Sequence, residues 1–487
     1  MELEVKTINA QQNGSVAENS EREPAVQWAL ASLALSMLLS SLGTSIANVA
    51  LPNLAQTFNA SFQEVQWIVI AYLLAITTLI VSAGRLGDIL GRRRLLLGGI
   101  SLFTLASALC TIAPTLWLLI ASRAIQGLGA AIMMALTMAF VSETVPKTKT
   151  GSAIGLLGTM SAIGTALGPS LGGLLIAGLS WRAIFFINLP LGVLTLFLAH
   201  RYLPADQKKP KAERADFDYM GTLLLALTLA AYALAMTTGR GSFGPLSMAL
   251  LLAAFVGVYL FVLAEARTAS PLIRLATFRN QVLTASLATS ALVSTVMMAT
   301  MVVGPFYLSR TLGLDAALVG FVLSVGPLVA ALTAVPAGRI ADRFGTQYVT
   351  NAGLIGMASG ALTLAMLPSS FGIPGYIAPL ATITASYALF QTANNTAVMI
   401  AISPDQRGAI SGMLNLSRNL GLITGASVMG AVFAFASATT DITTAPPEAV
   451  ASGLRITFAV AASLIVVALA IATGASRHAL HNREVAP

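Results

Sequence analysis

Charged residues are scarce in this sequence of 487 residues, at 9%, whereas 56% of the residues are hydrophobic. A typical soluble domain carries roughly 25% charged residues. A soluble chain this apolar could not cover its surface with polar groups, so the composition excludes an ordinary soluble globular protein. Lipid is the solvent that removes this problem, and the composition is typical of a protein embedded in a membrane.

Residues that build enzyme centres are also few. The single cysteine, Cys110, lies in an apolar run and excludes an intramolecular disulfide framework, while the three histidines, His200, His478 and His481, lie at span ends or in the tail. No HExxH or paired CxxC spacing, no GxSxG elbow and no P-loop occurs. We therefore expect no enzyme activity, no metal, no cofactor and no nucleotide site for an ATP-driven pump on this chain.

Apolar runs of about 20 residues recur from Trp28 to Thr473, and each is long enough to cross the hydrocarbon core of a bilayer. They predict fourteen transmembrane helices and hence an all-α integral membrane protein. The long runs at 116–142 and 151–178 exceed one straight crossing and are expected to tilt or project. The expected spans are 26–48, 65–84, 95–113, 116–142, 151–178, 183–203, 219–238, 246–265, 283–308, 316–337, 349–367, 374–400, 408–436 and 453–474.

Basic residues predict which ends of the spans lie in the cytoplasm. With the N-terminus inside, the inner segments hold twenty-one Lys and Arg residues, whereas the outer loops hold only Arg182, Arg240, Arg310 and Arg455. This imbalance follows the positive-inside rule, and an odd number of spans would destroy it. It also accounts for the net charge of +8, so we expect no nucleic-acid partner.

Two copies of one loop indicate duplicated halves, a recurrent transporter architecture. GRLGDILG at 84–91 follows the second span and GRIADRFG at 338–345 follows the tenth. The first 25 residues are polar and net acidic, which predicts a disordered cytoplasmic tail rather than a signal peptide. We expect a tail at 1–25, a six-helix bundle at 26–203, a cytoplasmic loop at 204–218, two inserted helices at 219–265, a second six-helix bundle at 283–474 and a cytoplasmic tail at 475–487.

These features resemble one known family. The loop GRLGDILGRRR is similar to the signature between spans two and three of the major facilitator superfamily. Further stretches resemble its fourteen-span drug–proton antiporter branch, in the right order along nearly the whole chain: IANVALP, LLIASRAIQGLGAA, GTALGPSLGG, WRAIFFINLPLG and EARTASPLIRLATFRN. The resemblance implies the major facilitator fold, with two six-helix bundles plus two inserted helices, and multidrug-type export of small amphiphilic molecules.

The resemblance also implies that the repeated loop is a conformational switch. Asp88 is expected near helix N-termini, where the helix dipole stabilises a carboxylate, and the arginines after it can reach carboxylates and the anionic leaflet. The family interpretation is a charge latch that stabilises the outward-facing state. The alternative is topology alone, because arginines are ordinary at an inner span end. The candidate switch residues are Gly84, Asp88, Gly91, Arg92, Arg93, Gly338, Asp342, Arg343 and Gly345.

Arg123 lies about eight residues into the fourth span, roughly 12 Å deep at 1.5 Å per residue. A guanidinium at that depth is costly and usually functional. The resemblance assigns Arg123, together with Gln126 and Gly127, to proton coupling. The alternative is a structural arginine that bonds the carbonyls of neighbouring helices.

Gly164, Gly168 and Gly172 recur every four residues on one face of the fifth span, with Pro169 and Gly173 beside them. We expect Pro169 to bend the helix and the small residues to let another helix approach closely. The resemblance identifies this stripe as the antiporter motif, which occurs in exporters more than in uptake symporters. The alternative is a tight helix contact that has no bearing on transport direction.

Polar residues in spans one, twelve and thirteen are candidates for a central substrate cavity where the halves meet. The alternative is that they form hydrogen bonds between helices and hold the bundle together. The candidates are Asn48, Gln391, Asn394, Asn395, Asn415, Arg418 and Asn419.

A carboxylate is missing where the branch commonly has one in span one, at Gly43, and no acidic residue lies in the middle of an expected span. The usual membrane-embedded proton carrier is therefore absent. A cavity that holds Arg123 and Arg418 without an acid is expected to be electropositive, because a low dielectric magnifies an unbalanced charge. We hypothesise that the substrate is neutral or anionic.

Together these features predict a secondary active exporter in the inner membrane of a bacterium, driven by proton antiport through alternating access, with both termini cytoplasmic. The expected partners are the bilayer, a small-molecule substrate and protons, and the expected state is a monomer. The alternatives are an uptake symporter or facilitator on the same fold, an exporter of a neutral or anionic substrate without direct proton antiport, a membrane enzyme or receptor, and half of an ABC-type permease.

Overall fold

The computed structural model describes residues 2–144, 150–206, 218–238, 244–268, 280–400, 407–438, 442 and 445–485. Within these ranges the chain is helical apart from short turns and has no strand. Fourteen helices in this described part are long and apolar enough to cross a membrane, which confirms the predicted number of spans and the all-α class. Helices suit this role because each satisfies its own backbone polar groups in lipid.

The first six spans are built from seven helices because the sixth span is interrupted. A turn at Ile187 separates two helices inside the predicted span 183–203. Pro190 lies in the first turn of the second of them, where its missing N–H leaves no helical hydrogen bond unmade. The helices are α1 (Glu2–Phe58), α2 (Phe62–Leu90), α3 (Arg92–Ile112), α4 (Leu116–Thr144), α5 (Thr150–Gly178), α6 (Ala183–Phe186) and α7 (Asn188–Tyr202).

The rest of the described chain contains the inserted pair and the last six spans. Spans nine and thirteen each include a π-helical turn, a widened turn that often occurs at functional sites. The elements are α8 (Tyr219–Thr238), α9 (Pro245–Arg267), α10 (Gln281–Phe306), the π-turn η4 (Tyr307–Thr311), α11 (Ala316–Phe344), α12 (Thr346–Met366), the 3₁₀ turn η5 (Ser369–Phe371), α13 (Gly372–Ile400), α14 (Arg407–Thr424), the π-turn η7 (Gly425–Met429), α15 (Gly430–Ala436) and α16 (Pro447–Val485).

Both copies of the repeated loop have the same backbone structure. Each ends in a glycine with positive φ, Gly91 at 98° and Gly345 at 85°. The glycine N–H donates to the carbonyl four residues earlier, that of Gly87 at 2.9 Å and that of Ala341 at 3.0 Å. Each glycine thus ends one helix and directly precedes the next, in a left-handed conformation that favours glycine.

The first helix begins well before the first span. α1 begins at Glu2, so the backbone of residues 2–25 is helical where the sequence predicts a disordered tail. The segment is rich in Glu, Gln and Ala, which have high helix propensity, and it continues the first span without a break. The apolar part that can cross the membrane is Val26–Phe58, ten residues longer at its C-terminal end than the predicted 26–48.

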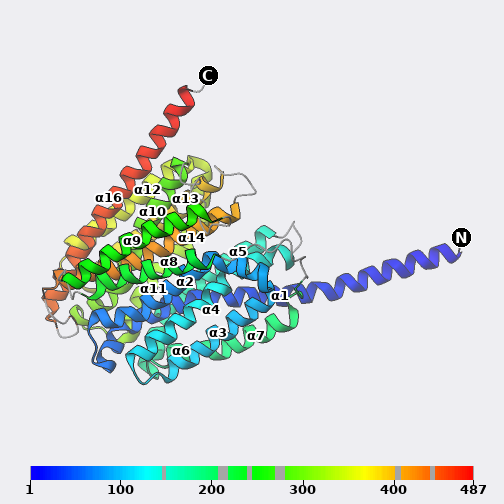
Figure 1. The fold of residues 1–487 in the computed structure, drawn as a ribbon, viewed down its shortest axis with the longest axis horizontal. Coiled ribbons are helices and arrows are strands. Elements are labelled where there is room, and N and C mark those ends of the chain that lie inside the picture. The colour runs from blue at the N-terminus through cyan, green and yellow to red at the C-terminus, as the bar shows by residue number, and fades with distance from the viewer. Residues whose placement is uncertain are drawn as a thin grey trace.

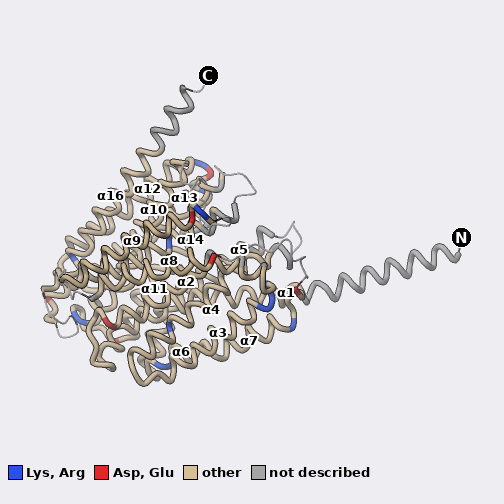
Figure 2. The backbone as a smooth tube through the Cα atoms, viewed as in Figure 1, with Lys and Arg blue, Asp and Glu red and all other residues tan. Residues whose placement is uncertain are grey.

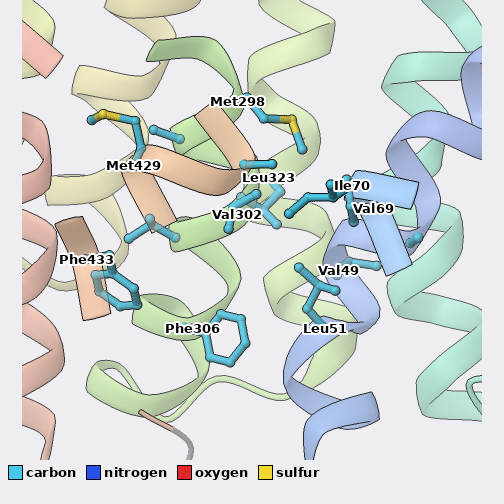
Figure 3. Packing of buried hydrophobic residues seen from close by; sticks show 14 of the residues in the cluster. Val49, Leu51, Val69, Ile70, Met298, Val302, Phe306, Leu323, Met429 and Phe433 are labelled. Atoms are coloured by element: carbon cyan, nitrogen blue, oxygen red, sulfur yellow. The ribbon is translucent and has the colours of Figure 1, made fainter. Parts of the chain in front are cut away.

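The helices form two groups, α1–α7 and α10–α16, which lie side by side (Figure 1). The inserted helix α8 packs against both groups, through α2 and through η7, and α9 packs against α8. One buried apolar cluster extends through both groups, with Val49 and Val69 from the first and Met298 and Val302 from the second (Figure 3). No hydrophobic effect favours helix association within lipid, so close packing of this kind is what joins the halves.

Most of the charged residues coloured in Figure 2 lie at or near the ends of helices. The outermost helix, α9, has large apolar side chains that are well exposed, such as Leu252, Phe255 and Tyr259. In a spanning helix such a face is the surface that meets lipid tails. The described part of the chain therefore has the architecture of a multi-pass membrane protein.

Candidate functional site

The glycine stripe of α5 packs against α1. A Cβ atom added to Gly164 would lie 2.5 Å from the carbonyl oxygen of Leu38, and one added to Gly172 would lie 2.8 Å from Val49 Cγ1. Gly168 faces Ser45 in the same way, and the Ser45 hydroxyl donates to the Gly164 carbonyl at 3.3 Å. The stripe thus allows the close helix approach that its spacing predicts. Its meaning for transport direction stays a prediction.

Gly173 faces away from α1 and contacts the other half of the molecule. An added Cβ would lie 3.0 Å from the Cα of Gly320 on α11 and would clash with the carbonyl of Ala316. An added Cβ at Gly320 would in turn meet the carbonyl of Pro169. At this end of the bundle α5 and α11 therefore touch backbone to backbone, and the two halves are closed against each other. The helix continues through Pro169 to Gly178.

Arg123 is completely buried, and each of its nitrogens donates to an oxygen. Nε donates to the Ile68 carbonyl at 3.0 Å, Nη2 to the Gly43 carbonyl at 2.9 Å and Nη1 to Gln126 Oε1 at 2.5 Å. Gln126 Nε2 donates onward to Ser107 Oγ at 2.7 Å. This arrangement ties α4 to α1, α2 and α3, as the structural alternative for Arg123 predicts. The role in proton coupling stays a prediction.

Tyr72 of α2 completes the surroundings of Arg123. The guanidinium carbon lies 4.0 Å from the centroid of the Tyr72 ring, a cation–π distance. Gly43 and Gly127 leave room for this tyrosine, because an added Cβ would lie 2.8 Å from Tyr72 Oη at Gly43 and 2.5 Å from the Tyr72 carbonyl at Gly127. Close packing against Tyr72 in the first bundle therefore explains why the motif has a glycine at position 127.

The first copy of the repeated loop is held by a residue from the linker. Asp206 accepts from the backbone N–H groups of Arg93 at 2.7 Å and Arg94 at 3.2 Å, which are free donors at the start of α3. Arg93 Nη2 also donates to the His200 carbonyl. An added Cβ at Gly91 would lie 2.6 Å from Asp206 Oδ2. The carboxylate cap of this loop is thus Asp206, which the sequence analysis did not identify.

Other switch candidates are less constrained. The side chain of Asp88 lies outside the described residues, and Arg92 is half-buried. In the second copy Asp342 and Arg343 are both exposed, and Arg343 lies over the Phe344 ring at 5.4 Å. Added Cβ atoms would meet nothing within 4 Å at Gly84, Gly338 and Gly345. The charge latch stays a prediction in both copies.

Two of the cavity candidates, Asn48 and Asn394, are buried and donate to backbone carbonyls. The Asn48 amide is buried and donates to the carbonyls of Thr44 and Ser45 in its own helix, at 3.1 and 3.3 Å. Asn394 is buried and donates across to the Ser286 carbonyl of α10 at 3.3 Å. Asn394 thus forms a bond between helices, as the alternative predicts, whereas the bonds that Asn48 donates lie within α1. A cavity role for either residue stays a prediction.

The remaining cavity candidates are more open. Gln391 and Asn395 are half-buried and lie 3.4 Å apart as a donor–acceptor pair along α13. Asn415 and Arg418 are half-buried on α14, while Asn419 is buried. Arg418 Nε and Asn419 Nδ2 are buried nitrogens for which the described part of the chain offers no acceptor. Arg418 and Asn419 therefore have donors available for a ligand.

Contacts between the halves also involve residues that the sequence analysis did not consider. Gln66 of α2 is buried and donates to the Ala426 carbonyl of η7 at 2.9 Å. Phe62, also on α2, packs edge-on against Phe306 of α10 at 4.7 Å between ring centroids (Phe306 is labelled in Figure 3). A polar residue near the start of an expected span was the available signal for Gln66.

The inserted helix α8 bonds to both halves. Trp67 Nε1 of α2 donates to Thr237 Oγ1 at 3.0 Å, and the Tyr232 hydroxyl donates to Thr424 Oγ1 of α14 at 3.2 Å. α8 is therefore a packing element between the two bundles rather than a separate appendage. Trp67 is half-buried in this contact.

Two buried carboxylates meet at the ends of the inserted helices. Asp218, before α8, and Glu265, in the last turn of α9, are 7% and 3% exposed. A Cβ added to Gly221 would lie 2.5 Å from Asp218 Oδ2 and 2.6 Å from Glu265 Oε1, so the two carboxylates are neighbours. Asp218 Oδ1 accepts from the Gly221 N–H at 2.8 Å and so caps α8. Among the described residues no group of three or more His, Cys, Asp or Glu could hold a metal ion.

Comparison with known proteins connects this arrangement to transporters. The family model for the Major Facilitator Superfamily matches residues 33–426. The riboflavin transporter RibZ of Clostridioides difficile (strain 630) is 30% identical over an alignment that covers 82% of this chain and 87% of that protein. The multidrug resistance protein Stp of Mycobacterium tuberculosis (strain CDC 1551 / Oshkosh) is 32% identical over 82% of this chain and 74% of that protein.

Solved structures share the fold at low sequence identity. A bacterial homologue of the human lysosomal transporter Spinster, solved in an inward-facing and unoccupied conformation, superposes with a TM-score of 0.68. The match covers 93% of this chain and 97% of that chain at 15% identity. A mutant of the nucleoside transporter NupG superposes with a TM-score of 0.63 at 14% identity, over 92% of this chain and 99% of that chain.

Proposed function

The chain belongs to the Major Facilitator Superfamily and is a membrane transporter rather than an enzyme, and from this premise we propose that it is a secondary active exporter of small amphiphilic molecules. Relatives named multidrug resistance protein Stp and multidrug efflux pump LfrA, the latter from Mycolicibacterium smegmatis (strain ATCC 700084 / mc(2)155), support export. The observation that carries the proposal is the backbone contact of Gly173 with Gly320, which lies beside the glycine stripe of α5.

The contact gives the exporter a gate. With the N-terminus inside, as the basic residues predict, Gly173 and Gly320 lie near the outer ends of α5 and α11. The halves would then be closed toward the outside in this structure, and substrate would enter between them from the cytoplasm. Rocking of the two bundles would separate the two glycines and open the path outward. We infer that the proton gradient across the bacterial inner membrane drives this cycle.

The driving force requires a proton site other than Gly43. That position holds a backbone carbonyl bonded to Arg123, not a carboxylate. The proposal of antiport therefore rests on the family resemblance and on the named efflux relatives. A proton that binds at another position of the protein would have to be released to the cytoplasm in the state that is closed toward the outside.

A second candidate is transport of a metabolite rather than a drug. The similarity to the riboflavin transporter RibZ is the observation that favours it. Riboflavin is an uncharged aromatic molecule near neutral pH, and the residues proposed to line the cavity are Asn, Gln and Arg, without an acid that would favour a cation. This second candidate includes a transporter that takes its substrate up into the cell rather than exporting it.

Membrane vesicles of both orientations test the proposal. Everted vesicles energised with ATP would be given three related dyes: cationic rhodamine 6G, fluorescein methyl ester, which lacks a free carboxylate, and fluorescein, which carries one. We expect protein-dependent accumulation of at least one dye, abolished by an ionophore that collapses the pH gradient. Accumulation by right-side-out vesicles but not by everted ones would replace export with uptake.

A further inference from the structure

Arg418 is a guanidinium inside a membrane span, with an open position beside it. It lies eleven residues into α14 (Arg407–Thr424) and five residues, roughly 8 Å at 1.5 Å per residue, into Met413–Ala436, the part that can cross a membrane. Its side chain is half-buried, and its Nε is buried without an acceptor. Within the described part of the chain it forms no ion pair, and a charge left unpaired at such depth is costly. Intramembrane arginines are therefore expected to serve a ligand or a partner.

Asn419 adds a second donor next to the first. Its side chain is only 3% exposed, yet its Nδ2 has no acceptor among the described residues. Buried amide nitrogens are almost always hydrogen-bonded, so an orphan needs an explanation. Arginine has donors only, and the free group of Asn419 is also a donor. The missing complement of both residues is an acceptor, and a carboxylate offers two acceptor oxygens and a compensating charge.

The neighbours of α14 show which way this stretch of helix faces. Ser417 donates to the Leu287 carbonyl at 2.5 Å, so the adjacent face is packed on α10. Seven residues after Asn419, the Ala426 carbonyl accepts from Gln66 of α2, in the other bundle. Residues seven apart lie on nearly the same side of a helix. Asn419, with Arg418 at its edge, is therefore on the side of α14 that is turned toward the first bundle.

Arg123 does not compete for this role. It is fully buried within the first bundle, and its three nitrogens already donate to Ile68, Gly43 and Gln126. The sequence predicts a cavity that holds both Arg123 and Arg418, but in the structure only Arg418 has a donor available for a ligand. Arg418 supplies the positive charge that faces the boundary between the halves.

We propose that Arg418 and Asn419 form the binding site for an anionic group, a carboxylate, on the molecule that the protein exports. The proposal rests on the proposed function and specifies its substrate class as amphiphilic organic acids. The guanidinium binds the carboxylate through its paired N–H donors, and the Asn419 amide donates a further hydrogen bond. The attraction between the guanidinium and the carboxylate is stronger than in bulk water, because protein surrounds part of the Arg418 side chain and lowers the local dielectric. A lysine at 418 keeps the charge but not the two-pronged geometry.

The local charge can be measured without knowing the substrate. In a Cys110→Ala background, which removes the single native cysteine, Asn415→Cys places a thiol one helical turn before Arg418. The rates of modification by the anionic ethylsulfonate and the cationic trimethylammonium methanethiosulfonate reagents give a ratio that reports the local potential. We expect a ratio well above that of a free thiol, falling about tenfold on Arg418→Gln and staying high in Arg418→Lys. A ratio unchanged by Arg418→Gln overturns the proposal, and so does a thiol that neither reagent reaches.

Binding of matched dyes tests the ligand class. Fluorescein and its methyl ester differ by the carboxylate, and their affinity for purified protein in nanodiscs is measured by fluorescence polarisation. We expect Arg418→Gln to weaken fluorescein binding about tenfold and to leave the ester unchanged. No preference of the wild type for fluorescein, or equal losses for both dyes, overturns the carboxylate site. If Arg418-dependent binding holds but energised everted vesicles transport neither dye, the export proposal fails while the site stands.

Discussion

The Gly43 carbonyl accepts a hydrogen bond from Nη2 of Arg123 at 2.9 Å, inside a wholly buried network. In the branch that the sequence resembles, span one commonly carries an acidic residue at this position. Here a backbone oxygen takes the place beside the arginine, and no room remains for a side chain. The hydrogen-bond donors of Arg123 are satisfied by neutral oxygens rather than by a carboxylate. Arg123 therefore has no acidic partner at position 43 that could take up or release a proton.

Gly43→Ala is expected to destabilise the protein through Tyr72. The added Cβ would lie 2.8 Å from Tyr72 Oη and 3.4 Å from Phe103 Cε2. Overpacking of this kind costs about 1–3 kcal/mol. Thermal unfolding in detergent measures it, and the double variant with Tyr72→Phe should regain part of the loss because the clashing hydroxyl is gone. Strictly additive losses would show that the hydroxyl is not the obstacle.

Arg123→Gln should clearly lower the stability of the protein and should have little effect on its affinity for substrate. The replacement cannot reach the carbonyls of Ile68 and Gly43 together, so hydrogen bonds to a charged group are lost at about 1.5–3 kcal/mol each. Arg182→Gln is the matched control, since Arg182 is exposed and stacks on Trp181 at 4.4 Å. Unfolding temperature and dye binding are compared for both variants. An Arg123→Gln protein as stable as the control would refute the structural role.

The two repeat glycines provide a matched pair. Gly91→Ala and Gly345→Ala both force an alanine into positive φ, which we expect to cost about 1 kcal/mol. Only at Gly91 does the new Cβ also meet Asp206, at 2.6 Å. Gly91→Ala should therefore be clearly more destabilising than Gly345→Ala. Equal losses in unfolding temperature would show that the contact with Asp206 yields without cost.

Asp206→Ala should weaken the start of α3. The carboxylate accepts from the backbone N–H groups of Arg93 and Arg94, and removal of such a cap costs about 1 kcal/mol. Asp206→Asn keeps an acceptor oxygen and should lose less. Thermal unfolding orders the three proteins, and hydrogen exchange at the first turn of α3 locates the change. An unaltered exchange rate there in Asp206→Ala would contradict the capping role.

Gly173→Ala should impair export, whereas Gly178→Ala should not. The first adds a methyl group between α5 and α11, and the second adds one where nothing lies within 4 Å. A steric cost of about 1–2 kcal/mol against the state closed at Gly320 corresponds to roughly a five- to thirtyfold shift in population. Dye accumulation in everted vesicles is the readout. Equal activity of the two variants would show that the backbone contact is not part of the gate.

The sequence predicted the spans because a helix that crosses lipid must be a long apolar run. It predicted that the two loops are copies of one structure because both end in a glycine, Gly91 and Gly345, at a position with positive φ. Arg123 was recognisable from its depth in an apolar run. The hydrogen-bond partners of Arg123 could not be predicted, because they are the backbone carbonyls of Ile68 and Gly43, and any residue type carries such a carbonyl. Asp206 was missed for a related reason: it caps a helix more than a hundred residues earlier in the chain.

Substrate-triggered proton movement tests the central claim most directly. Everted vesicles that hold a pH gradient, monitored by a pH-sensitive fluorescent dye in the lumen, would receive the compound that accumulates in them. The account predicts release of lumenal protons on addition of the compound, absent from vesicles that lack the protein and reduced in Gly173→Ala relative to Gly178→Ala. Accumulation of the compound with no proton release from the protein-containing vesicles would contradict proton-coupled export.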